Sequence, residues 1–225
     1  MQIKKALYYR LLLIACSLAP MVLFGQSTED YPKTVGFGVK GGVTNSLLNV
    51  GIPLPLQQIN STFVPSYGII FSRIDKKTVG FQLEINYVTK SWEENPVSDY
   101  LFNATLNYIE IPMLTTLHFG NRFKFLVNFG PYLSILLNEE SSNAIAPESD
   151  YSPYYENRSP RKGDFGMIGG AGFRLETKLG LFQLEARYTY GFQNLYDSVD
   201  NQLEYSNFAT MGVFLSYQIL FFNGQ

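Results

Sequence analysis

Few side chains in this sequence are suited to catalysis. His118 is the only histidine, and the only cysteine, Cys16, lies in the N-terminal segment. A Ser–His hydrolase sets its histidine against a serine and an acid or amide, and a zinc site gathers several His or Cys ligands. The turn-like residues Gly120-Asn121 follow His118 closely, which predicts a solvated turn residue there. We therefore predict that the protein is not an enzyme, with no catalytic residue, metal or cofactor.

Charged residues at alternating positions form the second candidate site. Four acids and four bases share the polar faces of predicted strands: Lys40, Glu84, Glu110, Lys124, Arg174, Glu176, Glu185 and Arg187. Inside a narrow lumen an unpaired charge is costly, so these groups should bridge one another. Arg174 and Glu176 are expected to pair with Glu185 and Arg187 across a hairpin. The set is either a structural charge network that fills the lumen or a gated polar path.

The segments that carry these charges alternate with a period of two. Leu181–Phe192 is the clearest: Phe182, Leu184 and Ala186 fall on one face, and polar residues fall on the other. Side chains alternate between faces along a strand, so this pattern predicts a strand with one apolar side. Eight segments are predicted: Val35–Thr44, Phe63–Ser72, Val79–Lys90, Leu106–Phe119, Phe123–Leu137, Phe165–Thr177, Leu181–Phe192 and Tyr205–Phe221.

The predicted connections differ in length. Three are short: Arg73–Thr78, Gly120–Arg122 and Lys178–Gly180. Four are long: Asn49–Thr62, Trp92–Thr105, Asn138–Asp164 and Gln193–Glu204. All of these except the first carry several acidic residues. Short turns on one side and long loops on the other are expected of a bacterial outer-membrane barrel, with the long loops outside the cell. The acidic loops are expected to be solvated, or else to bind Ca²⁺ or bridge to lipopolysaccharide.

Composition indicates that the apolar face points outward. Charged residues make up only 16% of the chain, too few for the surface of a soluble barrel. The interior of an eight-stranded barrel is just wide enough for side chains, and the many Phe and Tyr side chains of the apolar face would overfill it. Aromatic residues also recur at strand ends, where membrane interfaces would lie. We predict an all-β fold: an eight-stranded antiparallel transmembrane up-and-down β-barrel.

The N-terminus is typical of an export signal. Lys4, Lys5 and Arg10 precede an apolar run and then Gly25, which predicts a signal peptide over residues 1–25 and a barrel over residues 26–225. Leu13-Ile14-Ala15-Cys16 leaves lipidation of Cys16 as an alternative. Without the three basic residues, 14 basic residues remain against 19 acidic ones, a net charge of −5 that argues against nucleic-acid binding.

Four short motifs, in order, resemble the PorT-like outer-membrane β-barrel proteins of Gram-negative bacteria. They are Tyr108-Ile109-Glu110-Ile111-Pro112, Gly130-Pro131-Tyr132, Asp164-Phe165-Gly166 with Gly169-Gly170-Ala171-Gly172, and Arg187-Tyr188-Thr189-Tyr190-Gly191. The resemblance covers roughly residues 36 to 221 and implies an eight-stranded barrel in the outer membrane. Its eponymous member is associated with the export and maturation of secreted proteins.

Two functions are compatible with these features. The first is a non-enzymatic barrel with a structural, adhesion or secretion/assembly-factor role, in contact with the lipid bilayer, lipopolysaccharide and other envelope or secretion-machinery proteins. The alternative is a small-solute channel or transporter, although eight strands leave no open pore.

Overall fold

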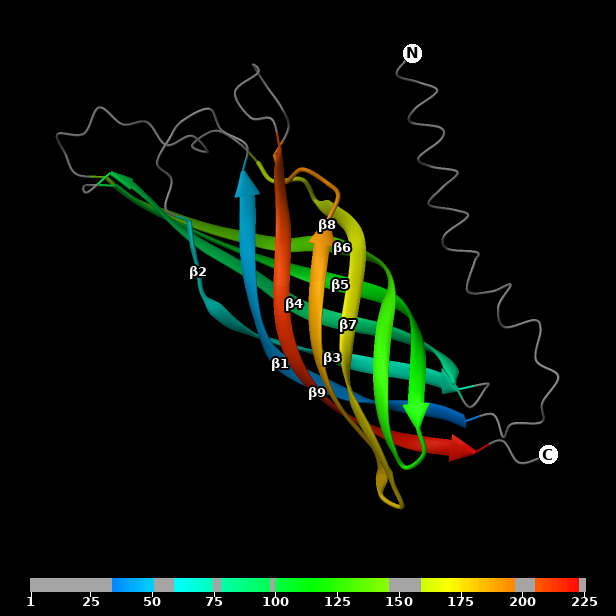
Figure 1. The fold of residues 1–225 in the computed structure, drawn as a ribbon. Helices are drawn as coiled ribbons and strands as arrows, with labels where there is room; N and C mark the ends of the chain where they lie inside the picture. The colour runs from blue at the N-terminus through cyan, green and yellow to red at the C-terminus, as the bar shows by residue number, and fades with distance from the viewer. Residues whose placement is uncertain are drawn as a thin grey trace, which may run out of the picture.

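The computed structural model describes residues 34–50, 59–74, 78–97, 100–145, 159–196 and 205–222. Nine strands form one sheet that closes on itself (Figure 1). They are β1 (Thr34–Val50), β2 (Ile59–Ser61), β3 (Phe63–Ile74), β4 (Val79–Val97), β5 (Tyr100–Gly120), β6 (Phe123–Ile145), β7 (Gly163–Thr177), β8 (Gly180–Gly191) and β9 (Ser206–Phe222). The predicted signal peptide and Cys16 lie outside the described residues.

The barrel has eight spanning strands, as predicted. β2 and β3 both pair with β4 and are separated only by Thr62, so together they form one spanning strand. Every pairing is antiparallel between successive spanning strands, and β1 pairs with β9 to close the barrel. Closure removes free edges along the paired length. Among the described residues, no helix is long and apolar enough to cross a membrane.

The predicted assignment of faces is confirmed. Along β8, Gln183, Glu185 and Arg187 are buried, whereas Phe182 and Leu184 are exposed. All eight predicted lumen charges lie on the inner face, and seven of them are fully buried. The exposed outer face is rich in large apolar side chains, including Phe119, Phe123 and Phe221 near the short-turn end. This is the surface that a lipid bilayer would cover.

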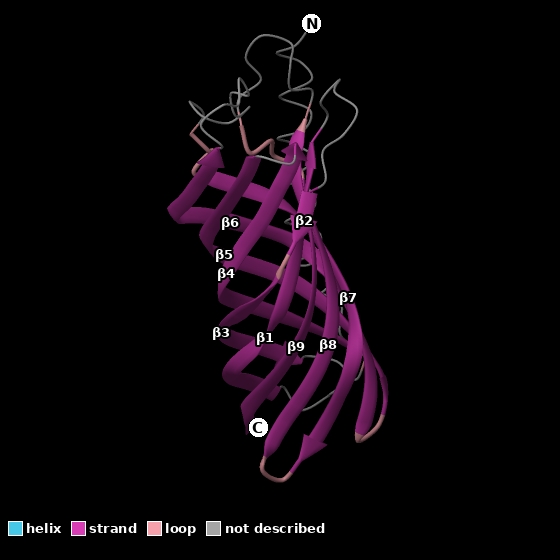
Figure 2. Cartoon of the chain, turned by 90° about the vertical axis from the view of Figure 1, so that its left-hand side faces the viewer, coloured by secondary structure: helices cyan, strands magenta, loops and turns pink. Residues whose placement is uncertain are grey.

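The predicted extent of the strands is wrong at the outer end. Trp92–Thr105 was expected to be a loop, but β4 continues to Val97 and β5 begins at Tyr100. β6 also extends beyond the predicted boundary at Leu137, and a β-bulge near Asn107 shifts its register against β5. Paired strands that lie outside the membrane need no apolar face. The alternation of apolar and polar residues that predicts a strand is therefore missing there. Figure 2 shows β4, β5 and β6 as long, neighbouring strands.

At the opposite end the hairpin turns are tight. The β5–β6 and β7–β8 connections are two residues each, and Gly120 and Gly180 adopt φ values of 118° and 139°. Residues that carry a side chain rarely adopt this backbone conformation, so glycine is required at these two positions. Phe123 stacks on Phe173 beside these turns, at a centroid distance of 5.3 Å. Both strand ends nearest the termini, at Thr34 and Phe222, lie at this end of the barrel (Figure 1).

Candidate functional site

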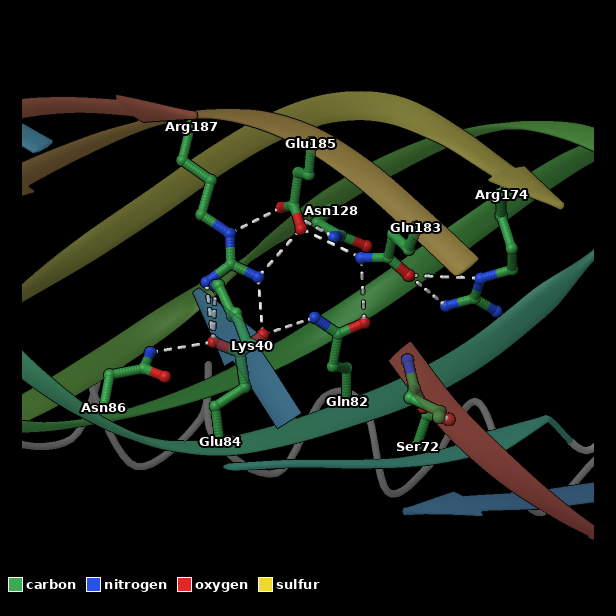
Figure 3. A network of polar contacts seen from close by, with 11 residues as sticks. Lys40, Ser72, Gln82, Glu84, Asn86, Asn128, Arg174, Gln183, Glu185 and Arg187 are labelled. Carbon is green, nitrogen blue, oxygen red and sulfur yellow. Dashed lines mark hydrogen bonds and ion pairs between the residues drawn. The ribbon is translucent and has the colours of Figure 1, made fainter. Parts of the chain in front are cut away.

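Four charged side chains meet in the middle of the lumen, and we refer to Lys40, Glu84, Glu185 and Arg187 as the central quartet. Arg187 donates from Nη1 and Nη2 to the Glu84 carboxylate at 2.8 and 2.6 Å. It donates from Nε and Nη2 to Glu185 at 2.6 and 2.9 Å. Lys40 Nζ donates to Glu84 Oε2 at 2.9 Å. Two acids and two bases from β1, β4 and β8 therefore neutralise one another across the barrel (Figure 3).

Amide side chains surround the central quartet. Asn86 Nδ2 donates to Glu84 at 2.8 Å, and Asn128 Nδ2 donates to Glu185 at 2.7 Å. Gln183 Nε2 donates to Glu185 at 2.9 Å, while its Oε1 accepts two bonds from Arg174 at 3.1 and 2.7 Å. These amides donate to carboxylate oxygens of Glu84 and Glu185 and so add to the bonds from the two cations. A buried ion pair is stable only when such additional hydrogen bonds satisfy its remaining lone pairs.

Two more ion pairs lie in the lumen, one on each side of the quartet. Lys124 Nζ contacts Glu176 at 2.6 Å near the short turns. Lys90 Nζ contacts Asp164 at 2.9 Å toward the outer end, and the Tyr132 hydroxyl donates to the same carboxylate oxygen at 2.9 Å. Aromatic rings surround the Lys90 ammonium: the centroids of Tyr108 and Phe208 both lie 4.8 Å from it. Lys124 and Lys90 are therefore each paired with a carboxylate, although Asp164 Oδ1 has no hydrogen-bond partner among the described residues.

The structure places the predicted charges inside but pairs them differently from the expected hairpin scheme. Arg174 lies opposite Gln183 and bonds to it, and Glu176 bonds to Lys124 instead of to Arg187. The reason is register: Glu185 and Arg187 lie opposite glycines on β7. Arg187 reaches across the lumen to Glu84 on β4, and Glu185 accepts a hydrogen bond from Asn128 on β6. Glu110 also lies inside, but outside these three ion-pair groups.

Sequence reasoning missed or misplaced three buried residues. Lys90, which ends the predicted strand Val79–Lys90, was not recognised as a lumen charge. Asp164 was assigned to a loop because it precedes the apolar alternation of β7. His118 was predicted to be a solvated turn residue, which is wrong: it is 2% exposed, and its Nε2 lies 3.2 Å from Nη1 of Arg174. The guanidinium can only donate, so Nε2 accepts and the histidine has a structural contact.

The outer end of the lumen is apolar. Its cluster, called here the outer cluster, consists of Leu48, Trp92, Ala104, Leu106, Tyr108, Leu195, Tyr196 and Phe208. Leu195 and Tyr196 come from the segment after β8, which turns inward: Leu195 N donates to Ser206 O, and Tyr196 N donates to Ser206 Oγ at 3.1 Å. The outer cluster thus covers the charged lumen with apolar side chains, which is unfavourable for a water-filled entrance.

No constellation suited to catalysis or metal binding is found in the described part of the chain. There, no three His, Cys, Asp or Glu side chains gather as a metal site would require. The lumen instead combines paired charges, amides and a terminal apolar cluster in a closed eight-stranded barrel. Comparison with known proteins identifies this architecture. Residues 24–197 match the family model for the outer membrane protein beta-barrel domain. The chain belongs to this family.

Solved outer membrane proteins are similar to this chain at low sequence identity, and the one with a TM-score of 0.50 supports the same fold. OprG, an outer membrane protein of Pseudomonas aeruginosa, is 11% identical with a TM-score of 0.50, over 84% of this chain and 94% of that one. AlkL, solved in lipid bilayers, is 9% identical with a TM-score of 0.47, over 89% and 96%. Outer membrane protein W of E. coli is 14% identical with a TM-score of 0.41, over 83% and 98%. No curated protein sequence matches this chain significantly.

The family places the protein in the outer membrane, where its apolar outer face is in contact with the lipid bilayer.

Proposed function

We propose that the protein is a closed, non-enzymatic outer-membrane barrel of the PorT-like type, with an adhesion or secretion/assembly-factor role exerted outside its lumen. The observation that carries this proposal is the central quartet. Arg187 on β8 binds both Glu84 on β4 and Glu185 through four hydrogen bonds, so it links opposite parts of the barrel wall. The hydrogen-bonded charges of the lumen are then a structural network.

A solute path would have to break this network. Separating one partner of a buried ion pair costs about 3–5 kcal/mol because the other charge remains uncompensated. The outer cluster is a second barrier, since a polar solute entering it would lose its hydration without gaining hydrogen bonds. These two barriers in series favour the structural role over the small-solute channel.

The outer extension of the barrel, β4 to β6 beyond the last β6–β7 pair at Ile135 and Gly163, is the favoured contact surface. The side chains of Glu139, Glu140 and Ser141 on β6 are exposed there, while the backbone of β6 remains paired to β5. It is acidic and rigidly attached to the barrel. These properties suit contact with another envelope protein, or with lipopolysaccharide through divalent cations.

Two measurements test the proposal together. A photo-crosslinking residue at Glu140 in intact outer membranes should capture envelope or secretion-machinery proteins, whereas the same residue at the lipid-facing Val213 should not. Planar-bilayer recordings of the purified protein should show no steady conductance. Conductance without protein crosslinks at Glu140 would favour the channel and would contradict the proposal.

A further inference from the structure

The outer part of β6 presents one backbone edge to its surroundings. Eight successive residues of β6, Asn138 to Ile145, have partners on β5. On the other side, β6 pairs with β7 only up to Ile135 and Gly163, and the last backbone bond between the two runs from Leu136 N to Lys162 O. Figure 1 shows that β4, β5 and β6 reach beyond the ends of β7 and β8. Beyond Leu136, no strand in the described part of the chain pairs with this side of β6.

The chain that leads into β7 turns away from this edge. Residues 159–162 lie outside any strand, and Arg161 N donates to Leu195 O at 2.8 Å, in the inward-turning segment after β8. An unpaired strand edge is a template on which a segment of another chain can form a further strand. An ordinary strand has about five or six residues. The eight edge residues of β6 are therefore enough to pair with a complete strand.

Two acidic side chains mark this edge. Glu139 and Glu140 are exposed and adjacent in the strand, so they point to opposite faces of it. Among the described residues, Glu140 accepts one hydrogen bond, from Asn138 at 3.3 Å, and neither acid forms an ion pair. Like charges that oppose each other across strands are destabilising, whereas opposite charges stabilise the pairing. The two acids therefore disfavour a second copy of this edge and favour a strand that carries basic residues.

We propose that the edge of β6 from Asn138 to Ile145 binds an extended, basic segment of a partner protein, which adds to the sheet as a further strand. This inference rests on the proposed function, because it specifies how the outer extension contacts an envelope or secretion-machinery protein. Backbone hydrogen bonds to β6 supply affinity for an extended segment of any sequence. Two consecutive basic residues, one on each face of the added strand, match Glu139 and Glu140 and select the partner.

Amide hydrogen exchange, followed by NMR on the full barrel in lipid nanodiscs, tests this proposal with a defined probe. The probe is a short peptide of alternating valine and threonine with two consecutive lysines at its centre. At a peptide concentration about ten times its dissociation constant, exchange of the edge-facing amides of β6 should slow about tenfold, because the added strand bonds them. A peptide with the same two lysines and with proline at alternate positions keeps its charge but cannot form a ladder, so it should give no protection.

Charge reversal on the edge separates the basic partner from an unselective one. The double variant Glu139→Lys with Glu140→Lys should lose the protection by the lysine peptide and gain protection by a peptide with two central glutamates. Glu93→Lys is the matched control, because Glu93 lies on β4 of the same extension but is paired on both sides, with Asn60 on β2 and Asn103 on β5. This control should keep the protection by the lysine peptide.

Three results would overturn strand addition: no protection of wild-type β6 by the lysine peptide, equal protection by the proline peptide, or protection that survives the double charge reversal. Protection by lipopolysaccharide with Ca²⁺ but not by the peptide would also overturn it, and would assign the edge to lipid. Envelope proteins crosslinked at Glu140 without any protection of β6 would overturn strand addition alone and leave the proposed function standing. Conductance without crosslinks would overturn the proposed function even if the peptide protects β6.

Discussion

Truncating Arg187 to alanine should destabilise the barrel strongly. The side chains of Arg187 and Glu84 are 3% and 0% exposed, and that of Glu185 is 2% exposed. After Arg187→Ala, Lys40 still contacts Glu84 at 2.9 Å. Glu185 keeps only neutral donors, from Asn128 and Gln183. One buried carboxylate is therefore left without a cation, and the free energy of unfolding should fall by about 3–5 kcal/mol.

Urea unfolding in lipid vesicles measures this loss, and two further variants separate charge from packing. Lys124→Ala is the control: its partner Glu176 is 31% exposed and can be hydrated, so the loss should stay near 1 kcal/mol or less. The double variant Arg187→Ala with Glu185→Gln should recover a large part of the loss, because the stranded charge is gone. A loss in Arg187→Ala no larger than in Lys124→Ala, or no recovery in the double variant, would refute the reasoning.

Four further predictions test topology, lipid contact, the outer cluster and processing. A cysteine at Glu140 should react with a membrane-impermeant maleimide on whole cells, and one at Arg122 only after the outer membrane is opened; the reverse labelling would invert the topology. Leu184→Arg, on the lipid-facing side, should cost about 2–4 kcal/mol in vesicles, while Glu140→Arg should cost less than about 0.5 kcal/mol; equal losses would contradict the face assignment. The single tryptophan, Trp92, is 1% exposed, so its emission should be blue-shifted and resist iodide quenching; quenchable emission would show an open outer end. The intact mass of membrane-extracted protein should correspond to a chain beginning near Gln26, and a lipid-modified cysteine would contradict this.

The barrel could be predicted from the sequence because lipid imposes a strict rule on every second residue. Along β8 each outward position from Phe182 to Tyr190 is apolar, and each inward position between them is polar. That alternation needs no knowledge of neighbouring strands. It also indicated which charges point inward, since the side of each charge follows from its parity relative to the apolar residues.

The partners of those charges could not be predicted in this way. Arg187 and Glu84 are separated by 103 positions and lie on strands that are not adjacent in the sheet. Their contact depends on barrel diameter and strand stagger, which a single strand pattern does not contain. Asp164 illustrates a related gap: it precedes the apolar alternation of its strand, so it could not be distinguished from a loop acid. The outer extension was missed because strands in water can have two polar faces.

The lumen network also bears on how the fold closes. Strand pairing between neighbours is local, and hairpins such as β7–β8 can form early because little chain separates their partners. The central quartet instead joins β1, β4 and β8, which are brought together only when β1 pairs with β9. The bonds between Arg187 and Glu84 therefore cannot stabilise an open sheet, whereas Lys40–Glu84 joins strands of one local meander and Arg187–Glu185 lies within β8. The bonds between Arg187 and Glu84 should therefore stabilise the closed state over open or misregistered sheets, because only the closed barrel brings Arg187 on β8 within bonding distance of Glu84 on β4.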